Sequence, residues 1–215
     1  VAITVRNDAA ATLGLVGPER PAMVVIADTG SIAYGEGADG EVTRAGGHGA
    51  VLGDCASAVS LGLAVLRHTA DVLDECETRG PLARAAIERL KLERATDIVA
   101  RIRHPDFDEP LVESLAAMLD PGMLASDPKA QAIVDAESAA LARNARRVAR
   151  AIRSRSPMRL PVLLVGCVFA WTPVIRDRVC AAVKDTGDVT IVESGECVHG
   201  AARVALDLLR VPPHD

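Results

Sequence analysis

Aromatic residues are scarce in this chain, whose 215 residues include two phenylalanines, one tyrosine and one tryptophan. Since the hydrophobic fraction is nevertheless 49%, the core must be built from alanine, valine, leucine and isoleucine. Long apolar runs are also lacking, and none approaches the roughly 18 residues that a membrane-spanning helix needs. We therefore expect an ordinary globular protein that has no membrane partner.

An excess of basic residues is lacking too, because the formal net charge is -5. This charge argues against a general nucleic-acid binder. The cysteines form no Cys-x-x-Cys pair and no zinc-like spacing with histidine; they are Cys55, Cys76, Cys167, Cys180 and Cys197. Their odd number, in a sequence without a recognisable signal peptide, predicts reduced thiols and a cytoplasmic location.

Glycine is concentrated in one stretch, since eight of the 17 glycines lie between Gly30 and Gly53. They alternate with strand-like apolar runs, the first of which starts at Met23. Glycines at this density mark a backbone that turns tightly and approaches another group closely. A phosphate or a sugar is the natural candidate for that group.

The remaining pattern alternates between strands and helices. Strands are expected over residues 1–5, 23–27, 31–34, 42–44, 162–165 and 189–192. Helices are expected over 8–16, 55–75, 82–102, 111–119, 129–155, 173–184 and 200–209. Five arginines share one face of the helix over 129–155, which we interpret as a solvated face rather than a nucleotide-facing stripe; they are Arg143, Arg146, Arg147, Arg150 and Arg153.

Four short motifs occur in a specific order: Asn7-Asp8-Ala9, Asp28-Thr29-Gly30-Ser31, Gly46-Gly47-His48-Gly49 and Gly53-Asp54. This order resembles the second part of N-acetylglucosamine kinases and the related BadF/BadG/BcrA/BcrD ATPases, within the actin, hexokinase and Hsp70 superfamily. The resemblance continues more weakly towards the end of the chain, through residues 126–133, 165–169 and 200–202.

This resemblance implies an α/β fold of the ribonuclease-H-like, actin-type ATPase class. Residues 1–20 would be the remnant of a first domain, and residues 21–215 would form the second domain, with a helical section over 55–155. Such kinases start with a further hairpin that carries an Asp-Gly-Gly-Thr phosphate loop, which is absent here. We therefore expect either a fragment of a longer polypeptide or a shortened relative.

The resemblance also implies an ATP-dependent kinase that uses Mg²⁺. Asp8 would accept the proton of the attacking sugar hydroxyl, although a helix cap is the plain alternative. Thr29, Gly30 and Ser31 would cradle the ATP phosphates. Asp28 stands where glycine is usual, so its carboxylate must share Mg²⁺ with the phosphates or point away from them.

By the same resemblance, the sugar substrate would be gripped by Gly47, His48, Gly49 and Asp54, where His48 replaces a tryptophan. A glycine loop that merely caps the following helix is the alternative. The last two positions implied by the family, Gly166 and Gly200, would line the nucleotide, but tight junctions explain them equally well.

Three other functions deserve consideration. Asp28-Thr29-Gly30 resembles an aspartic protease motif, but a second copy and the many strands of that class are missing. An iron-sulfur ATPase activator would need a cysteine just before Thr29, where Ala27 and Asp28 stand. A non-catalytic binding or subunit module is the main rival to a kinase. The sequence leaves open whether the protein forms a homodimer.

Overall fold

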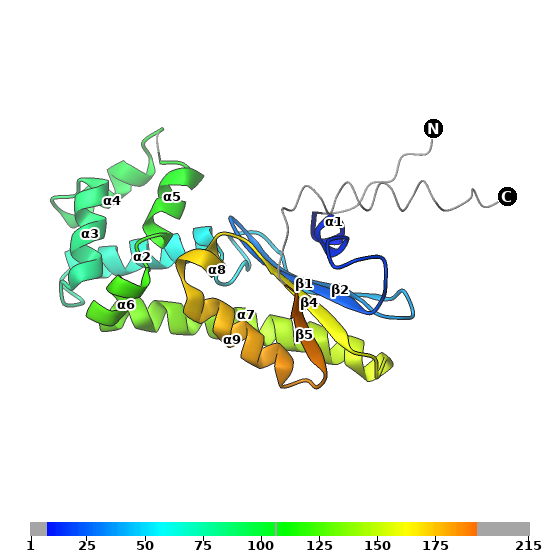
Figure 1. Cartoon of the computed structure of the whole chain (residues 1–215). Helices are drawn as coiled ribbons and strands as arrows, with labels where there is room; N and C mark the ends of the chain where they lie inside the picture. The colour runs from blue at the N-terminus through cyan, green and yellow to red at the C-terminus, as the bar shows by residue number, and fades with distance from the viewer. Residues whose placement is uncertain (1–7, 106, 193–215) are drawn as a thin grey trace.

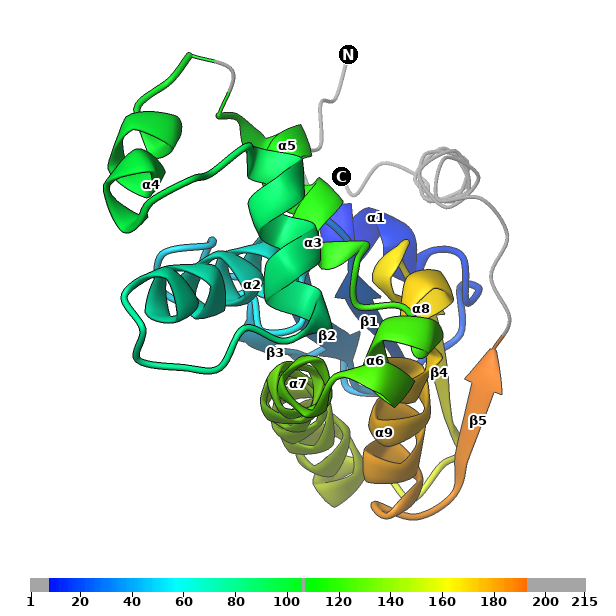
Figure 2. The same ribbon diagram turned by 90° about the vertical axis from the view of Figure 1, so that its left-hand side faces the viewer.

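A five-stranded mixed sheet forms the centre of the computed structural model, which describes residues 8–105 and 107–192. The strand order is β3-β2-β1-β4-β5 (Figures 1 and 2). The strands are β1 (Ala22–Ala27), β2 (Ser31–Glu36), β3 (Val42–Gly46), β4 (Leu160–Val165) and β5 (Val189–Val192). The first three pair antiparallel, whereas β4 lies parallel to β1 and β5 lies parallel to β4. This sheet confirms the expected α/β class.

In the described part of the chain, helices lie on both faces of the sheet (Figure 1). On the first face are α7 (Pro128–Arg155) and α9 (Pro173–Lys184), and on the second is α1 (Asp8–Leu13). The central strand β1 is buried on both sides: Met23 and Val25 belong to the larger core, and Val24 packs with Leu13 of α1. Burial on both faces explains why β1 reads as a continuous apolar run instead of alternating with polar residues.

The helices between β3 and α7 gather beyond one end of the sheet, on the left of Figure 1. They are α2 (Ala58–Leu73), α3 (Pro81–Leu90), α4 (Ala95–Ile102), α5 (Glu109–Ala116) and α6 (Pro121–Ser126). Helix α2 begins where Ser57 caps it, with the Ser57 hydroxyl accepting from Ser60 N at 3.0 Å. Helix α5 packs very closely on α2 at Gly62, where an added Cβ would lie 2.1 Å from the Val112 carbonyl oxygen. Helices are thus the regular elements described between β3 and β4.

Some expected elements differ from those observed. The single helix expected over 82–102 is two helices, because Lys91 adopts the left-handed conformation (φ 56°) and ends α3. Pro121 follows the end of α5 and also begins a further helix, α6, that was not expected; its missing N–H costs nothing at this position. The short helix α8 (Val168–Trp171) was not expected. The expected strand at 1–5 and helix at 200–209 lie outside the described residues.

The arginine-rich face of α7 serves packing in at least two places. Arg146 approaches Asp185 at 3.3 Å, just after α9. Arg153 donates to the carbonyl oxygens of Thr186 and Asp188 at 3.0 Å. These contacts stabilise the connection between α9 and β5, which favours a structural role over a nucleotide-facing one. Within the described ranges, no helix has the length and apolarity that crossing a bilayer would require.

Candidate functional site

A cavity of about 400 Å³ lies beside the β1–β2 hairpin, the start of α1 and the glycine-rich loop after β3. Its walls are formed by Asp8, Ile26, Asp28, Thr29, Gly30, Ser31, Ile32, Arg44, Gly47, Gly49 and Asp54. Eight of the predicted site residues therefore meet around one cavity, although they come from three separate segments of the chain. Of the other predicted residues, His48 and Gly166 are not part of this wall, and Gly200 lies outside the described residues.

Asp8 is the first residue of α1 and is exposed. One of its carboxylate oxygens, Oδ1, accepts a hydrogen bond from Ala9 N at 2.8 Å, and its carbonyl oxygen accepts one from the Thr12 hydroxyl at 2.8 Å. A carboxylate in a first helical turn is favoured by the helix dipole. The same side chain thus lines the cavity and supports its helix, so the two interpretations of Asp8 are compatible.

The hairpin from Asp28 to Gly30 is fastened to the start of α2. Asp28 N donates to Gly30 O at 2.9 Å, which closes the turn. The carbonyl oxygens of Asp28 and Thr29 accept from Ala58 N at 2.8 Å and Val59 N at 3.5 Å, two amides that a free helix start would leave without partners. The predicted phosphate hairpin is therefore held by backbone contacts to the helical section.

Asp54 lies between this hairpin and the glycine-rich loop. It is 8% exposed, has φ 60° and accepts from Gly49 N through Oδ1 at 3.2 Å. Its other carboxylate oxygen faces Gly30, where an added Cβ would lie 3.0 Å away. A non-glycine residue with positive φ is strained, and such strain is common at functional sites. The carboxylate expected to grip a sugar is thus fixed at the edge of the cavity.

Glu137 of α7 holds the segment that carries Asp54, a role that no sequence motif indicated. Its Oε2 accepts from Ala56 N at 2.7 Å and from the Ser60 hydroxyl at 2.8 Å. The Ser31 hydroxyl adds a further bond, donating to the Cys55 carbonyl oxygen at 2.7 Å. Ser31 therefore connects the two predicted binding segments as well as lining the cavity.

The loop after β3 adopts backbone conformations with positive φ that favour glycine. Gly46, Gly47 and Gly49 have φ values of 79°, 67° and 80°, which side chains rarely adopt. Arg44 of β3, a residue that the sequence motifs missed, donates to the carbonyl oxygens of Gly46 at 3.1 Å and Gly47 at 2.9 Å. His48 is exposed and its Nδ1 lies 3.5 Å from the Arg44 guanidinium.

Gly166 supports the hairpin from behind. It has φ 123°, and an added Cβ would lie 2.0 Å from the Ala27 carbonyl oxygen, so only glycine allows β4 to end against β1 here. This approach places Cys167 N 3.3 Å from the Asp28 carboxylate. Burial, together with the hydrogen bond to Asp28, raises the pKa of the Cys167 thiol to about 12. Gly166 thus forms a tight junction between the end of β4 and β1, which is the alternative to a nucleotide-lining role that the sequence left open.

A second carboxylate reaches the hairpin from the helical section. Glu113 of α5 accepts a hydrogen bond from the Thr29 hydroxyl at 2.5 Å. The Thr29 hydroxyl, which was expected to face a phosphate, therefore has a partner within the protein.

The profile of the BadF/BadG/BcrA/BcrD ATPase family matches residues 2–205, most of the chain. An N-acetylmuramic acid/N-acetylglucosamine kinase of Clostridium acetobutylicum is 27% identical over 125 residues, which cover 58% of this chain and 41% of that one. An N-acetyl-D-glucosamine kinase of Dictyostelium discoideum is 32% identical over 78 residues, 36% of this chain and 24% of that one.

The fold of the chain is also similar to those of solved kinase structures. A candidate N-acetylglucosamine kinase of Chromobacterium violaceum superposes with a TM-score of 0.70 at 26% identity, over 91% of this chain and 63% of that one. A hexokinase shares the fold, with a TM-score of 0.57 at 16% identity, over 96% of this chain and 55% of the hexokinase. The chain thus spans less than two thirds of each of these proteins. The four motifs, the mixed sheet and the profile match together show that the chain belongs to the BadF/BadG/BcrA/BcrD ATPase family.

Proposed function

We propose that this chain carries the catalytic site of an ATP-dependent sugar kinase, which transfers the γ-phosphate to a hydroxyl of an N-acetylglucosamine-like amino sugar. One observation carries the proposal: Asp8, the hairpin at Thr29 and the loop ending at Asp54 meet around a single cavity. The named activities of the relatives from Clostridium acetobutylicum and Dictyostelium discoideum support the choice of substrate class.

In this proposal Asp8 accepts the proton of the attacking hydroxyl. Phosphoryl transfer depends mainly on positioning and charge stabilisation, and a carboxylate that accepts this proton is the usual protein contribution to proton transfer. Asp54 and the backbone of Gly47 and Gly49 would hold the ring hydroxyls. Fixed acceptors select a hydroxylated ligand, because an unpaired buried polar group is costly when a wrong ligand binds.

The charges around the cavity suit a nucleotide that carries Mg²⁺. Asp8, Asp28 and Asp54 are its carboxylates, and Arg44 is the single guanidinium in the described wall. Among residues 8–105 and 107–192, no three acidic, histidine or cysteine side chains are grouped to hold a metal ion. Mg²⁺ is usually held by one or two carboxylates together with phosphates. Bound there, it would neutralise the charge of the phosphates, while Thr29 and Gly30 position them.

We further propose that residues 1–20 belong to a first domain and that the second domain starts at residue 21. The longer chain of the Chromobacterium violaceum neighbour supports this division, since the present chain covers 63% of it. A cytoplasmic location and a homodimer stay predictions.

Sugar-dependent ADP release, measured with the longest natural polypeptide that contains this chain and a panel of amino sugars, tests the proposal. Asp8→Asn should lower kcat by about 100-fold or more, the usual contribution of a general base. Asp108→Asn is the control, because it removes the charge of another carboxylate at a helix start, where Asp108 accepts from Leu111 N at 3.1 Å. Unchanged turnover in Asp8→Asn would remove Asp8 as the base, and ADP binding without any turnover would favour the non-catalytic module.

A further inference from the structure

The contact between Thr29 and Glu113 joins two parts of the molecule that are 84 residues apart in sequence. Thr29 is exposed at the tip of the hairpin, and Glu113 is half-buried on α5. The bond places a carboxylate on the hydroxyl that a phosphate would use. Its position therefore bears on which form of a nucleotide this hairpin accepts.

The backbone of Glu113 is fixed relative to the hairpin. Helix α5 packs on α2 at Gly62, with backbone so close that an added Cβ would lie 2.1 Å from Val112 O. Helix α2 in turn donates Ala58 N to Asp28 O at 2.8 Å. Since each link is a backbone contact in a packed core, a ligand that takes the Thr29 hydroxyl must displace the Glu113 side chain rather than helix α5.

A displaced Glu113 would still lie close to the ligand. Its charge also acts on the Cys167 thiol, whose pKa is raised by burial, by Asp28 and by Glu113. Two carboxylates, Asp28 and Glu113, therefore face the same tip of the hairpin. Two like charges 4 Å apart change a dissociation constant by about fivefold in water and by several hundredfold or more at an effective dielectric of 20.

We propose that Glu113 determines the form of nucleotide that binds: its carboxylate occupies the Thr29 hydroxyl, disfavours a bare polyphosphate and favours one whose charge is neutralised by a divalent cation. This inference rests on the proposed function, because it takes the phosphates to lie at Thr29 and Gly30. It assigns Glu113 a role in specificity, with the proton transfer left to Asp8.

Calorimetric titration of ADP, with and without Mg²⁺, tests this role without measuring turnover. Glu113→Gln keeps an oxygen that can accept from Thr29 but removes the charge. We expect it to tighten binding of metal-free ADP by about tenfold or more and that of Mg²⁺-ADP by much less. Glu109→Gln is the matched control, because it removes the same charge from the same helix at an exposed position, and it should leave both affinities unchanged.

The outcomes separate the two proposals. If wild type binds ADP and Glu113→Gln behaves like Glu109→Gln in both conditions, the role of Glu113 is overturned and the kinase proposal stands. If wild type and both variants, folded by circular dichroism, bind no ADP with or without Mg²⁺, the nucleotide site itself is wrong. A gain in Glu113→Gln that is equal with and without Mg²⁺ would contradict the dependence on the cation.

Discussion

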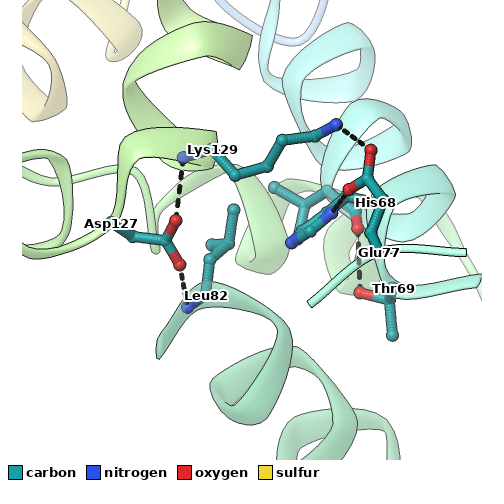
Figure 3. A network of polar contacts seen from close by, with 7 residues as sticks. His68, Thr69, Glu77, Leu82, Asp127 and Lys129 are labelled. Atoms are coloured by element: carbon teal, nitrogen blue, oxygen red, sulfur yellow. Dashed lines mark hydrogen bonds and ion pairs between the residues drawn. The ribbon is translucent and has the colours of Figure 1, made fainter. Parts of the chain in front are cut away.

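The ring of His68 lies 2.6 Å, through Nδ1, from Oε2 of Glu77, while its buried Nε2 has no partner among the described residues (Figure 3). His68 is 3% exposed in α2, and Glu77 follows that helix and also pairs with Lys129 of α7. The hydrogen bond from Lys129, followed by that from His68, lowers the pKa of Glu77. An ionised Glu77 can only accept, so Nδ1 must be the donor.

We therefore predict that neutral His68 carries its proton on Nδ1 and none on Nε2. The buried Nε2 would otherwise be a donor without an acceptor, which costs more than an unused lone pair. Nitrogen-15 chemical shifts of the ring at neutral pH report the tautomer directly. A protonated Nε2 with a bare Nδ1 would contradict the assignment, and Glu77→Gln should weaken the preference for Nδ1.

The same region depends on Asp127, which we expect to be important for stability (Figure 3). Asp127 is 3% exposed, caps α7 through Lys129 N at 2.8 Å and accepts from Leu82 N of α3 at 2.8 Å. Asp127→Ala removes a cap and leaves the Leu82 amide unpaired in the interior. The free energy of unfolding should fall by about 2–4 kcal/mol, measured by urea denaturation. Asp120→Ala, which removes the exposed cap of α6, should cost about 1 kcal/mol or less.

The contribution of Asp127 should vanish in acid. Burial opposes its charge, but the amides of Leu82, Lys129 and Ala130 outweigh burial and lower its pKa from 3.8. With the folded pKa below the unfolded one, the unfolded state binds more protons in this range. The stabilisation is thus complete above pH 3.8 and is lost as the pH falls through the folded pKa. The difference in stability between wild type and Asp127→Asn should shrink below that pH, and a constant difference would contradict this account.

Local sequence signals predicted most elements but missed contacts between distant segments. The alternation of apolar runs with turn residues predicted β1 to β3, and the helix expected over 173–184 matches α9. Helix α3 ends at Lys91, where no glycine or proline in the sequence indicated a helix end. Glu113 and Glu137 lie on ordinary amphipathic helices, so nothing in their neighbourhood marks them. Their importance arises from the packing of α5 and α7 against the site, which a single sequence does not encode locally.

The contribution of Glu137 to the free energy of unfolding can be measured. Glu137→Ala removes the acceptor of both Ala56 N and the Ser60 hydroxyl, and the Ala56 amide has no water-exposed alternative inside this turn. We expect a loss of about 2–3 kcal/mol in thermal or urea unfolding, since hydrogen bonds to a charged group are among the stronger ones. Ser60→Ala removes one of the two bonds and should cost about 1 kcal/mol or less. Equal losses in the two variants would show that the Ala56 contact adds nothing.

Cys167 should be chemically inert while Asp28 is charged. Its pKa of about 12, set by burial and by the hydrogen bond to Asp28, leaves almost no thiolate at about pH 8. We predict that iodoacetamide modifies the exposed Cys76 well before Cys167, as followed by mass spectrometry of peptides. Asp28→Asn removes the negative charge and should speed modification of Cys167 without affecting Cys76. Rapid modification of Cys167 in the wild type would contradict the contact with Asp28.

Asp28 also provides the final test of where a nucleotide binds. Its carboxylate lines the cavity and accepts a hydrogen bond from Cys167 N at 3.3 Å. Asp28→Gly should therefore tighten ADP binding most when Mg²⁺ is absent, by about fivefold or more for a charge 4 Å from a phosphate. If the nucleotide lies at this hairpin, Asp28 and Glu113 act on it together. The gain in the free energy of ADP binding for Asp28→Gly combined with Glu113→Gln should then differ from the sum of the two single gains, as it does for coupled neighbours. Calorimetric titration of the two single variants and the double variant measures that coupling. Equal ADP affinities for wild type and Asp28→Gly under both conditions would mean that the phosphates lie away from Thr29 and Gly30.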